Sequence, residues 1–323
     1  MNTQNQPNKA LAKKASAQTN KKKEGTLVET QSQHPLGFSI PSKDWYTGYV
    51  SREIAGVVDL DIFASAHRLG HNVLLAGPTG SAKTTATYAY ASHVNLPVVN
   101  IPCNGSAEPS LFIGKWTRLK DGSFDFILGE LALAVLHGGV ILLDEVNFLK
   151  PNIGAYLHGL LDGRRILTIP EAQGSSAPTT IKAHDDCFIV GAYNPNYIGT
   201  KPLNQAFRNR FAVKLSFPYL PSVEEQLVQS DSLRQLAINL RLEVDAGNIS
   251  TPVSTNRLIE TEQFALDGEL GFDFALNNFV SNFDEDEQQA VQDVLVQFAP
   301  LIYGELFDGV YPEDALFNPN NKV

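Results

Sequence analysis

Eight consecutive residues have the types and spacing of a phosphate-binding loop: Gly77-Pro78-Thr79-Gly80-Ser81-Ala82-Lys83-Thr84. The loop follows a strand-like run at 72–76 and precedes a helix-like segment, so its backbone N–H groups would surround an anion at a helix N-terminus. There Lys83 is expected to reach the β- and γ-phosphates of a nucleotide, and the Thr84 hydroxyl to bind Mg²⁺. These eight residues and Thr85 are the candidate nucleotide-binding residues.

Ala82 departs from the pattern, which has Gly directly before the Lys. Helical dihedrals at Ala82 would make the extra methyl group tolerable, whereas a left-handed conformation would cost roughly 1–2 kcal/mol. The alternative interpretation is a chance glycine turn before a helix, and the flanking strand and helix weigh against it.

Three polar residues follow buried strands further along the chain. Asp144 and Glu145 end the apolar run at 140–143, at the edge where parallel sheets present residues to ligands. Asp144 is expected to hold Mg²⁺, and Glu145 to orient and deprotonate an attacking water. Asn194 ends the next buried strand, where an amide would hold that water or sense the γ-phosphate. An Asn-Pro turn without such a role is the alternative.

Three arginines are candidates for contact with the same nucleotide. Arg208 and Arg210 lie at the end of a predicted helix, where one of them would reach a neighbouring subunit's γ-phosphate as an arginine finger. Arg257 begins a helix in the C-terminal part and is a candidate lid contact. The sequence leaves open whether Arg208 or Arg210 is the finger.

The elements that would position these residues follow from the hydrophobic pattern. Strands and helices alternate over 53–217, which predicts an α/β fold with a doubly wound parallel sheet. Hairpins are predicted near 111–128 and 165–182. Beyond Pro221 the pattern is helical only, with apolar faces at 222–240, 255–267 and 285–302. The acidic run at 284–287 is interpreted as a helix start, where negative charge complements the helix dipole.

We therefore expect three parts: a disordered basic tail at 1–34, an α/β nucleotide-binding domain at 35–220 and a small helical domain at 221–323. The tail contains six Lys and two Glu, although the whole chain has a net charge of −10. The acidic remainder argues against a broad nucleic-acid footprint. A solvated leader is the alternative to a binding role for the tail.

Composition excludes several classes of protein. The chain has 323 residues with 43% hydrophobic content, enough to bury a core, and no apolar run approaches the ~18 residues that span a bilayer. The polar start lacks the apolar stretch of a secretory signal, so we expect a cytoplasmic protein that does not bind membranes. Cys103 and Cys187 are expected to be buried free thiols, and the scattered histidines suggest no zinc site.

Taken together, these motifs resemble the AAA+ ATPases, within them the MoxR-type group and its NorQ, CbbQ and gas-vesicle GvpN relatives. The resemblance covers roughly 40–265. It rests on the loop as Walker A, Leu142-Leu143-Asp144-Glu145 as Walker B, Tyr193-Asn194-Pro195 as sensor 1, Arg208-Asn209-Arg210-Phe211 as the finger region and Thr255-Asn256-Arg257 as sensor 2.

The resemblance implies an ATP-hydrolysing, Mg²⁺-dependent ring protein, usually a hexamer, that remodels or activates a protein client. It implies that the hairpins at 111–128 and 165–182 are the group's inserts. Such rings often work with a separate von Willebrand factor A-domain partner. Two alternatives stay open: a nucleic-acid-stimulated motor, and a slow nucleotide-binding module that assembles but hardly hydrolyses.

Overall fold

The computed structural model describes residues 37–105, 107–195 and 202–319. The described residues form two compact units, one ending at Pro218 and the other beginning at Tyr219. The first is an α/β unit and the second is helical, and each encloses its own hydrophobic core. The predicted basic tail at 1–34 lies outside the described residues.

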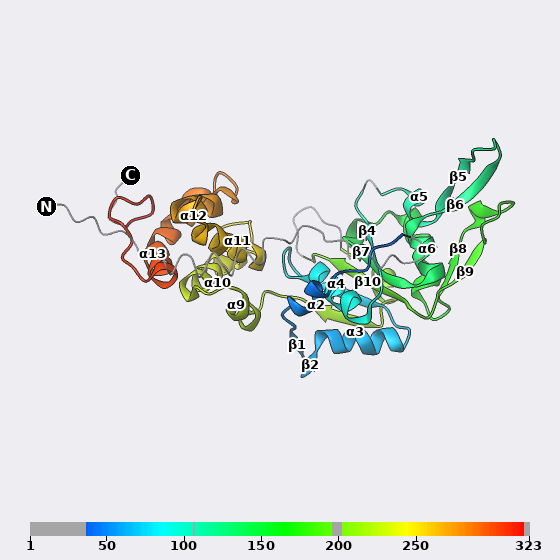
Figure 1. Ribbon diagram of the computed structural model, residues 1–323, viewed down its shortest axis with the longest axis horizontal. Helices are drawn as coiled ribbons and strands as arrows, with labels where there is room; N and C mark the ends of the chain where they lie inside the picture. The colour runs from blue at the N-terminus through cyan, green and yellow to red at the C-terminus, as the bar shows by residue number, and fades with distance from the viewer. Residues whose placement is uncertain (1–36, 106, 196–201, 320–323) are drawn as a thin grey trace. The chain divides into compact units, whose positions relative to one another are not determined.

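A five-stranded sheet lies at the centre of the α/β unit (Figure 1), and all four strand pairings in it are parallel. Its continuous apolar strands, β7 and β10, are flanked by a neighbour on each side, as their composition predicts. The doubly wound α/β fold predicted from the sequence is therefore confirmed. The strand order is β11 (Val213–Ser216), β3 (Val73–Ala76), β10 (Cys187–Tyr193), β7 (Gly139–Asp144) and β4 (Val98–Pro102).

The alternation of side chains along β7 divides the interior into two layers. Val140 and Leu142 enter one core, while Ile141 and Leu143 enter the other. Because successive strand residues point to opposite faces, each face needs its own cover of helices. Helices α3 (Asp59–Arg68) and α4 (Lys83–Val94) contribute to the first core, and α6 (Glu130–His137) and α7 (Pro151–Leu161) contribute to the second.

Two hairpins extend from one end of the α/β unit (Figure 1), within the two segments where the sequence predicts them. They contact each other: Trp116 Nε1 donates to the Glu171 carbonyl at 3.0 Å, and Ser176 N donates to Asp125 at 2.8 Å. The hairpins are β5 (Gly114–Arg118) with β6 (Phe124–Leu128), and β8 (Ile166–Thr168) with β9 (Thr180–Lys182). Smaller elements are α2 (Lys43–Thr47), β1 (Glu53–Ile54), β2 (Val57–Val58), α5 (Pro109–Phe112), η1 (Val146–Phe148), η2 (Pro170–Ala172) and α8 (Gln205–Arg208).

The helical unit contains α9 (Pro221–Leu227), α10 (Asp231–Asp245), α11 (Thr255–Leu266), α12 (Gly271–Ser281) and α13 (Gln288–Phe307). The helix predicted at 222–240 is interrupted because the Ser230 side chain caps a new helix, accepting from Leu233 N. Helix α12 is not among the predicted helices, although Phe272, Leu276 and Phe279 have helical spacing. The acidic run at 284–287 does precede a helix, α13.

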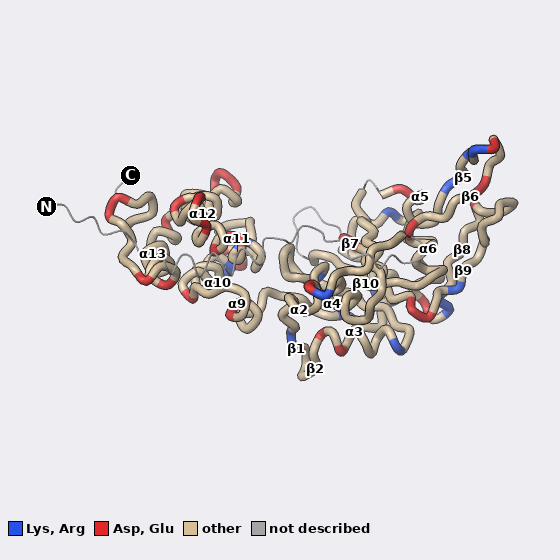
Figure 2. The backbone as a smooth tube through the Cα atoms, in the orientation of Figure 1, with Lys and Arg blue, Asp and Glu red and all other residues tan. Residues whose placement is uncertain are grey.

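Charge is divided unevenly between the two units. Residues 219–323 contain 19 Asp and Glu against 4 Lys and Arg, whereas residues 35–218 contain 14 against 15. Figure 2 marks the acidic residues along the backbone of the helical unit in red, with few basic residues in blue among them. The charge argument against a nucleic-acid footprint therefore applies to the helical unit and not to the nearly neutral α/β unit.

Both cysteines, Cys103 and Cys187, are free thiols with no exposed surface, as the sequence predicts. Burial raises the pKa of each thiol to about 12, so neither is a ready nucleophile near neutral pH. Among the described residues, no helix combines the length and the apolar composition needed to cross a bilayer.

Candidate active site

Three positions in the loop between β3 and α4 limit which residue fits without strain. A Cβ added at Gly77 would lie 2.1 Å from the carbonyl oxygen of Phe217, so only Gly fits there. Gly80 has φ of 68°, which Gly adopts without strain. Ala82 has φ of 67° and ψ of 24°, so it adopts the strained left-handed conformation and not the helical one. That left-handed conformation costs roughly 1–2 kcal/mol relative to Gly.

Helix α4 begins at Lys83, within the last two residues of the loop, without a side-chain cap. The first N–H groups of an uncapped helix have no intrahelical acceptor, and the helix dipole adds positive potential at the same place. An anion is the natural partner for these donors. The loop and the start of α4 can therefore accommodate an anion, and binding of nucleotide phosphates there stays a prediction.

Lys83 is the first residue of α4 and is only 8% exposed. Its Nζ donates to the carbonyl oxygens of Gly77 and Pro78, at 2.8 and 2.7 Å, and to Asn194 Oδ1 at 2.8 Å. These bonds use all three ammonium protons. Burial lowers the pKa of Lys83 to about 8, against the opposing effect of the Asp144 carboxylate. Phosphate oxygens would replace these neutral acceptors around Nζ. Because they are negatively charged, they would compensate the buried ammonium charge of Lys83 better.

Asn194 connects the loop to the middle of the sheet. It directly follows Tyr193, which pairs with Ala76 at the end of β3. Its Oδ1 accepts from Lys83, and its Nδ2 donates to Thr79 Oγ1 at 2.9 Å. Because β10 lies between β3 and β7, Asn194 stands between the loop and the end of β7.

Asp144 is the last residue of β7, and Glu145 is exposed just beyond it. The Asp144 carboxylate accepts the Glu145 N–H at 3.0 Å. Glu145 has φ of 56°, a left-handed conformation that is uncommon for a residue with a side chain. Within 37–105, 107–195 and 202–319, no hydrogen bond or ion pair engages the Glu145 carboxylate. It is free to accept a proton from a water molecule.

The donor set fits Mg²⁺ bound together with a nucleotide. Thr84 is the second residue of α4, next to Lys83, and the Asp144 carboxylate is close enough to influence the pKa of Lys83. Mg²⁺ usually takes one or two carboxylates together with substrate phosphates and water. Across the described residues, no group of three or more His, Cys, Asp or Glu side chains forms a separate metal cage.

The two candidate fingers differ in their surroundings. Arg210 is half-buried, and its Nη1 donates to the carbonyl of Ala206 at 2.6 Å. Arg208 ends α8 and is exposed. Its guanidinium makes no hydrogen bond or ion pair with any residue that the structure describes. Arg208 is thus the more available cation.

Arg257 belongs to the helical unit, near the start of α11. It is half-buried, with its guanidinium carbon 5.3 Å from the centre of the Phe283 ring. Burial lowers the pKa of this guanidinium below its ordinary value. Its predicted contact with the nucleotide stays a prediction.

A buried cluster beside the loop is not predicted from the sequence. Arg52 donates to the carbonyl of Ser81 in the loop at 2.9 Å, and its Nε lies 3.8 Å from the Asp59 carboxylate. The Tyr49 hydroxyl donates to the same carboxylate at 2.5 Å. These residues lie in an irregular stretch and the helix after it, without a motif or a regular spacing, so no sequence pattern identifies them.

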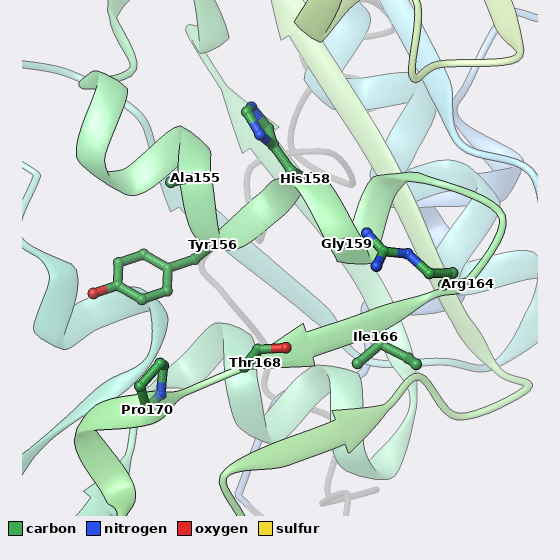
Figure 3. Close-up of a pocket in the computed structure, with 8 residues that line it drawn as sticks. All are labelled: Ala155, Tyr156, His158, Gly159, Arg164, Ile166, Thr168 and Pro170. Carbon is green, nitrogen blue, oxygen red and sulfur yellow. The ribbon is translucent and has the colours of Figure 1, made fainter.

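A pocket of about 370 Å³ lies between α7 and β8 (Figure 3), lined in part by Tyr156, His158 and Arg164. None of the predicted site residues lines it. Arg164 forms a 2.7 Å ion pair with Asp162. The phosphate loop, not this pocket, is therefore the candidate active site.

Comparison with known proteins gives the family. A family model described as an AAA domain of the dynein-related subfamily matches residues 72–211. The uncharacterized protein YojN of Bacillus subtilis is 28% identical over 244 residues, which cover 71% of this chain and 77% of that protein. The uncharacterized protein SERP0979 of Staphylococcus epidermidis is 31% identical over 242 residues, covering 69% of this chain and 89% of that protein.

A crystal structure of a candidate ATPase from Cytophaga hutchinsonii is similar over 79% of this chain and 90% of that chain, with a TM-score of 0.41 and 18% identity. The family assignment does not depend on this distant similarity. The family match at 72–211 contains the loop, Asp144, Glu145, Asn194 and Arg208. The chain therefore belongs to the AAA family of ATPases, in its dynein-related subfamily.

Proposed function

We propose that this protein hydrolyses ATP to ADP and phosphate at the carboxyl edge of the β3–β10–β7 strands. One observation carries the proposal: Lys83, Asn194 and Thr79 form one hydrogen-bonded group, and the free carboxylate of Glu145 follows the end of the neighbouring strand β7. A phosphate cradle with a positioned cation and an unpartnered base is what phosphoryl transfer to water requires.

Each group has a defined task in this proposal. The loop amides and Lys83 bind the β- and γ-phosphates, and Asn194, already bonded to Lys83, holds the attacking water or the γ-phosphate. Glu145 orients that water and accepts its proton. Mg²⁺, held by Thr84 and Asp144, would neutralise charge on the phosphates.

The site is completed by a second copy of the chain. Arg208 is exposed on the α/β unit and has no partner among the described residues, so it is available to a neighbouring subunit's γ-phosphate. Arg210 is held by the Ala206 carbonyl and is better suited to supporting the segment after α8. We therefore assign the finger to Arg208, in a ring that is hexameric in the proposal.

The work of the ring is the remodelling or activation of a protein client, as in the MoxR-type group, with a von Willebrand factor A-domain protein as a candidate partner. The β5–β6 hairpin supports this part of the proposal. Phe124 and Ile127 are 65% and 47% exposed there, although both are large apolar side chains. Exposed apolar side chains on a projecting hairpin suit contact with a protein.

A subunit-mixing experiment tests the composite site. Lys83→Ala removes ATP binding but keeps Arg208, while Arg208→Ala keeps the loop but lacks the finger. Each variant alone is expected to lose at least about 10³-fold in ATP turnover. An equimolar mixture should regain a substantial fraction of activity, because mixed rings contain intact sites. No recovery, in mixtures that a pull-down through a tag on one variant shows to be co-assembled, contradicts the composite site. Arg210→Ala is the matched control, because Arg210 is assigned to supporting its own subunit. Its mixture with Lys83→Ala should show no ATP turnover beyond the sum of the two variants measured alone.

A nucleic-acid-stimulated motor is the second candidate. The observation that favours it is the distribution of charge: the α/β unit is nearly neutral, and residues 1–34 contain six Lys against two Glu. Turnover measured at low salt with and without single- or double-stranded DNA discriminates the two functions. Stimulation that disappears when 1–34 is deleted supports the motor, while unchanged turnover supports the protein-remodelling function.

A further inference from the structure

Arg52 joins two segments that are distant in the sequence. Its side chain is buried, with only 4% of the residue exposed. Nη2 donates to the carbonyl of Ser81 at 2.9 Å, and Nη1 donates to the carbonyl of Pro218 at 3.1 Å. Ser81 lies in the phosphate loop, and Pro218 is the last residue of the α/β unit. One side chain thus fastens the loop to the end of the unit.

The guanidinium of Arg52 is itself fixed in position. The ring of Phe217 lies under it, 4.1 Å from the guanidinium carbon, and the Asp59 carboxylate lies 3.8 Å from Nε. Asp59 has no exposed surface and accepts the Tyr49 hydroxyl and the Leu60 N–H. A planar guanidinium with a stacked ring and a paired charge has little freedom to rotate. Nη1 and Nη2 are therefore held in a fixed orientation toward the two backbone carbonyls.

The contact with Ser81 acts on one peptide group. The carbonyl of Ser81 and the N–H of Ala82 belong to the same peptide, so fixing one fixes the other. A charged donor on the carbonyl also polarises the peptide and strengthens its N–H as a donor to an anion. In the proposed function this N–H belongs to the set that would face a phosphate at the start of α4. Arg52 thereby acts on the cradle without touching the nucleotide.

Ala82 gives this contact a specific purpose. Its left-handed φ of 67° is strained for a residue with a Cβ, and relaxation of that strain would rotate the Ser81–Ala82 peptide out of place. The Arg52 bond opposes this rotation. The opening limb of the loop is fixed separately, because Phe217 N donates to the Ala76 carbonyl at 2.7 Å. At the other end of the loop, the hydrogen bond from Arg52 holds the Ser81 carbonyl.

We infer that Arg52 is a positioning residue that holds the Ser81–Ala82 peptide in its phosphate-binding orientation and so compensates for Ala where a Gly would be unstrained. The inference rests on the proposed function, since its consequence is tighter binding of ATP. Arg52 touches neither the phosphates nor the reacting atoms.

Arg165 provides a matched control within the same unit. Its guanidinium also donates to two backbone carbonyls from separate segments, those of Gly70 and Cys187, at 2.7 and 2.5 Å. Neither carbonyl belongs to the phosphate loop. Arg165→Gln therefore removes an equivalent backbone bridge without disturbing the cradle.

The test is a thermodynamic cycle on the full chain, with Mg-ADP binding measured by calorimetry and unfolding followed in parallel. Arg52→Gln is expected to weaken binding about 10- to 100-fold, and Arg165→Gln to lower only the melting temperature. The gain in affinity from Ala82→Gly should be several-fold larger in the Arg52→Gln background than in the natural chain. Arg52→Lys keeps the charge but cannot span the carbonyls of Ser81 and Pro218, so its Mg-ADP affinity should lie between those of the natural chain and Arg52→Gln. It replaces Arg52→Gln in the test if that variant does not fold.

The outcomes separate the inference from the proposed function. Absence of nucleotide binding by the natural chain contradicts the proposed function itself. Normal binding by the natural chain and by both folded Arg52 variants overturns only the inference. An equal effect of Ala82→Gly in the two backgrounds also overturns it, because the two residues then do not act on the same peptide.

Discussion

Two glutamates, one in each unit, have opposite surroundings. In the helical unit, Glu262 is 6% exposed and accepts backbone N–H groups from Gln229 and Ser230, at 2.8 to 3.0 Å. In the α/β unit, Glu145 is exposed and its carboxylate has no partner among the described residues. The comparison shows that hydrogen bonding, rather than residue type or local charge, separates structural carboxylates from those available for chemistry.

Other carboxylates of the helical unit follow the structural pattern. Glu305 accepts the backbone and side chain of Ser232 at the start of α10. Glu224 is 1% exposed and forms a two-point contact with Arg241, at 2.7 and 3.0 Å. The strong negative charge of the helical unit therefore includes groups that hold helices together. Substitutions in the two units should separate effects on stability from effects on turnover.

The largest effect on stability is expected at the buried ion pair of the helical unit. Arg241→Met leaves Glu224 buried with the Thr255 hydroxyl as its remaining side-chain partner. An uncompensated buried charge costs about 3–5 kcal/mol in the free energy of unfolding. Denaturant unfolding measures this loss, and nucleotide affinity of the folded fraction should be unchanged. A loss below about 1 kcal/mol would show that the pair is not structurally important.

A smaller effect is expected for Glu262→Gln. The amide keeps one acceptor oxygen but loses the charge that strengthens its bonds to Gln229 N and Ser230 N. The free energy of unfolding should fall by about 1–3 kcal/mol, with ATP turnover of the folded protein unaltered. A change in turnover at full folding would place Glu262 in the chemistry and remove the contrast with Glu145.

The smallest effect is a dependence of stability on pH that arises in the α/β unit. Burial lowers the folded-state pKa of His67 below its ordinary 6.5, so the unfolded chain binds the proton more readily. The stability that neutral His67 contributes is therefore complete above about pH 6.5 and is lost as pH falls. His67→Gln removes the titrating group and should flatten the melting temperature between pH 7 and pH 5. An unchanged slope excludes His67 as its source.

The sheet and its ends were predictable because the signals are local. Apolar runs mark β7 and β10, and the eight-residue loop follows β3 directly. The left-handed conformation of Ala82 is one of two alternatives that the residue types of the loop leave open. The bridge from Arg52 to Ser81 joins positions 29 residues apart and depends on tertiary packing, so no spacing rule predicts it. The free state of Arg208 and the bound state of Arg210 likewise appear only in three dimensions.

ATP turnover by Glu145→Gln, measured as phosphate release with Mg-ATP beside the natural chain and Glu262→Gln, tests the central claim most directly. The substitution removes the proposed base while keeping its size. We expect turnover to fall by about 10²- to 10⁴-fold with nucleotide affinity retained, while folded Glu262→Gln turns over ATP like the natural chain. Equal turnover by the natural chain and Glu145→Gln would contradict the assignment of hydrolysis to this site.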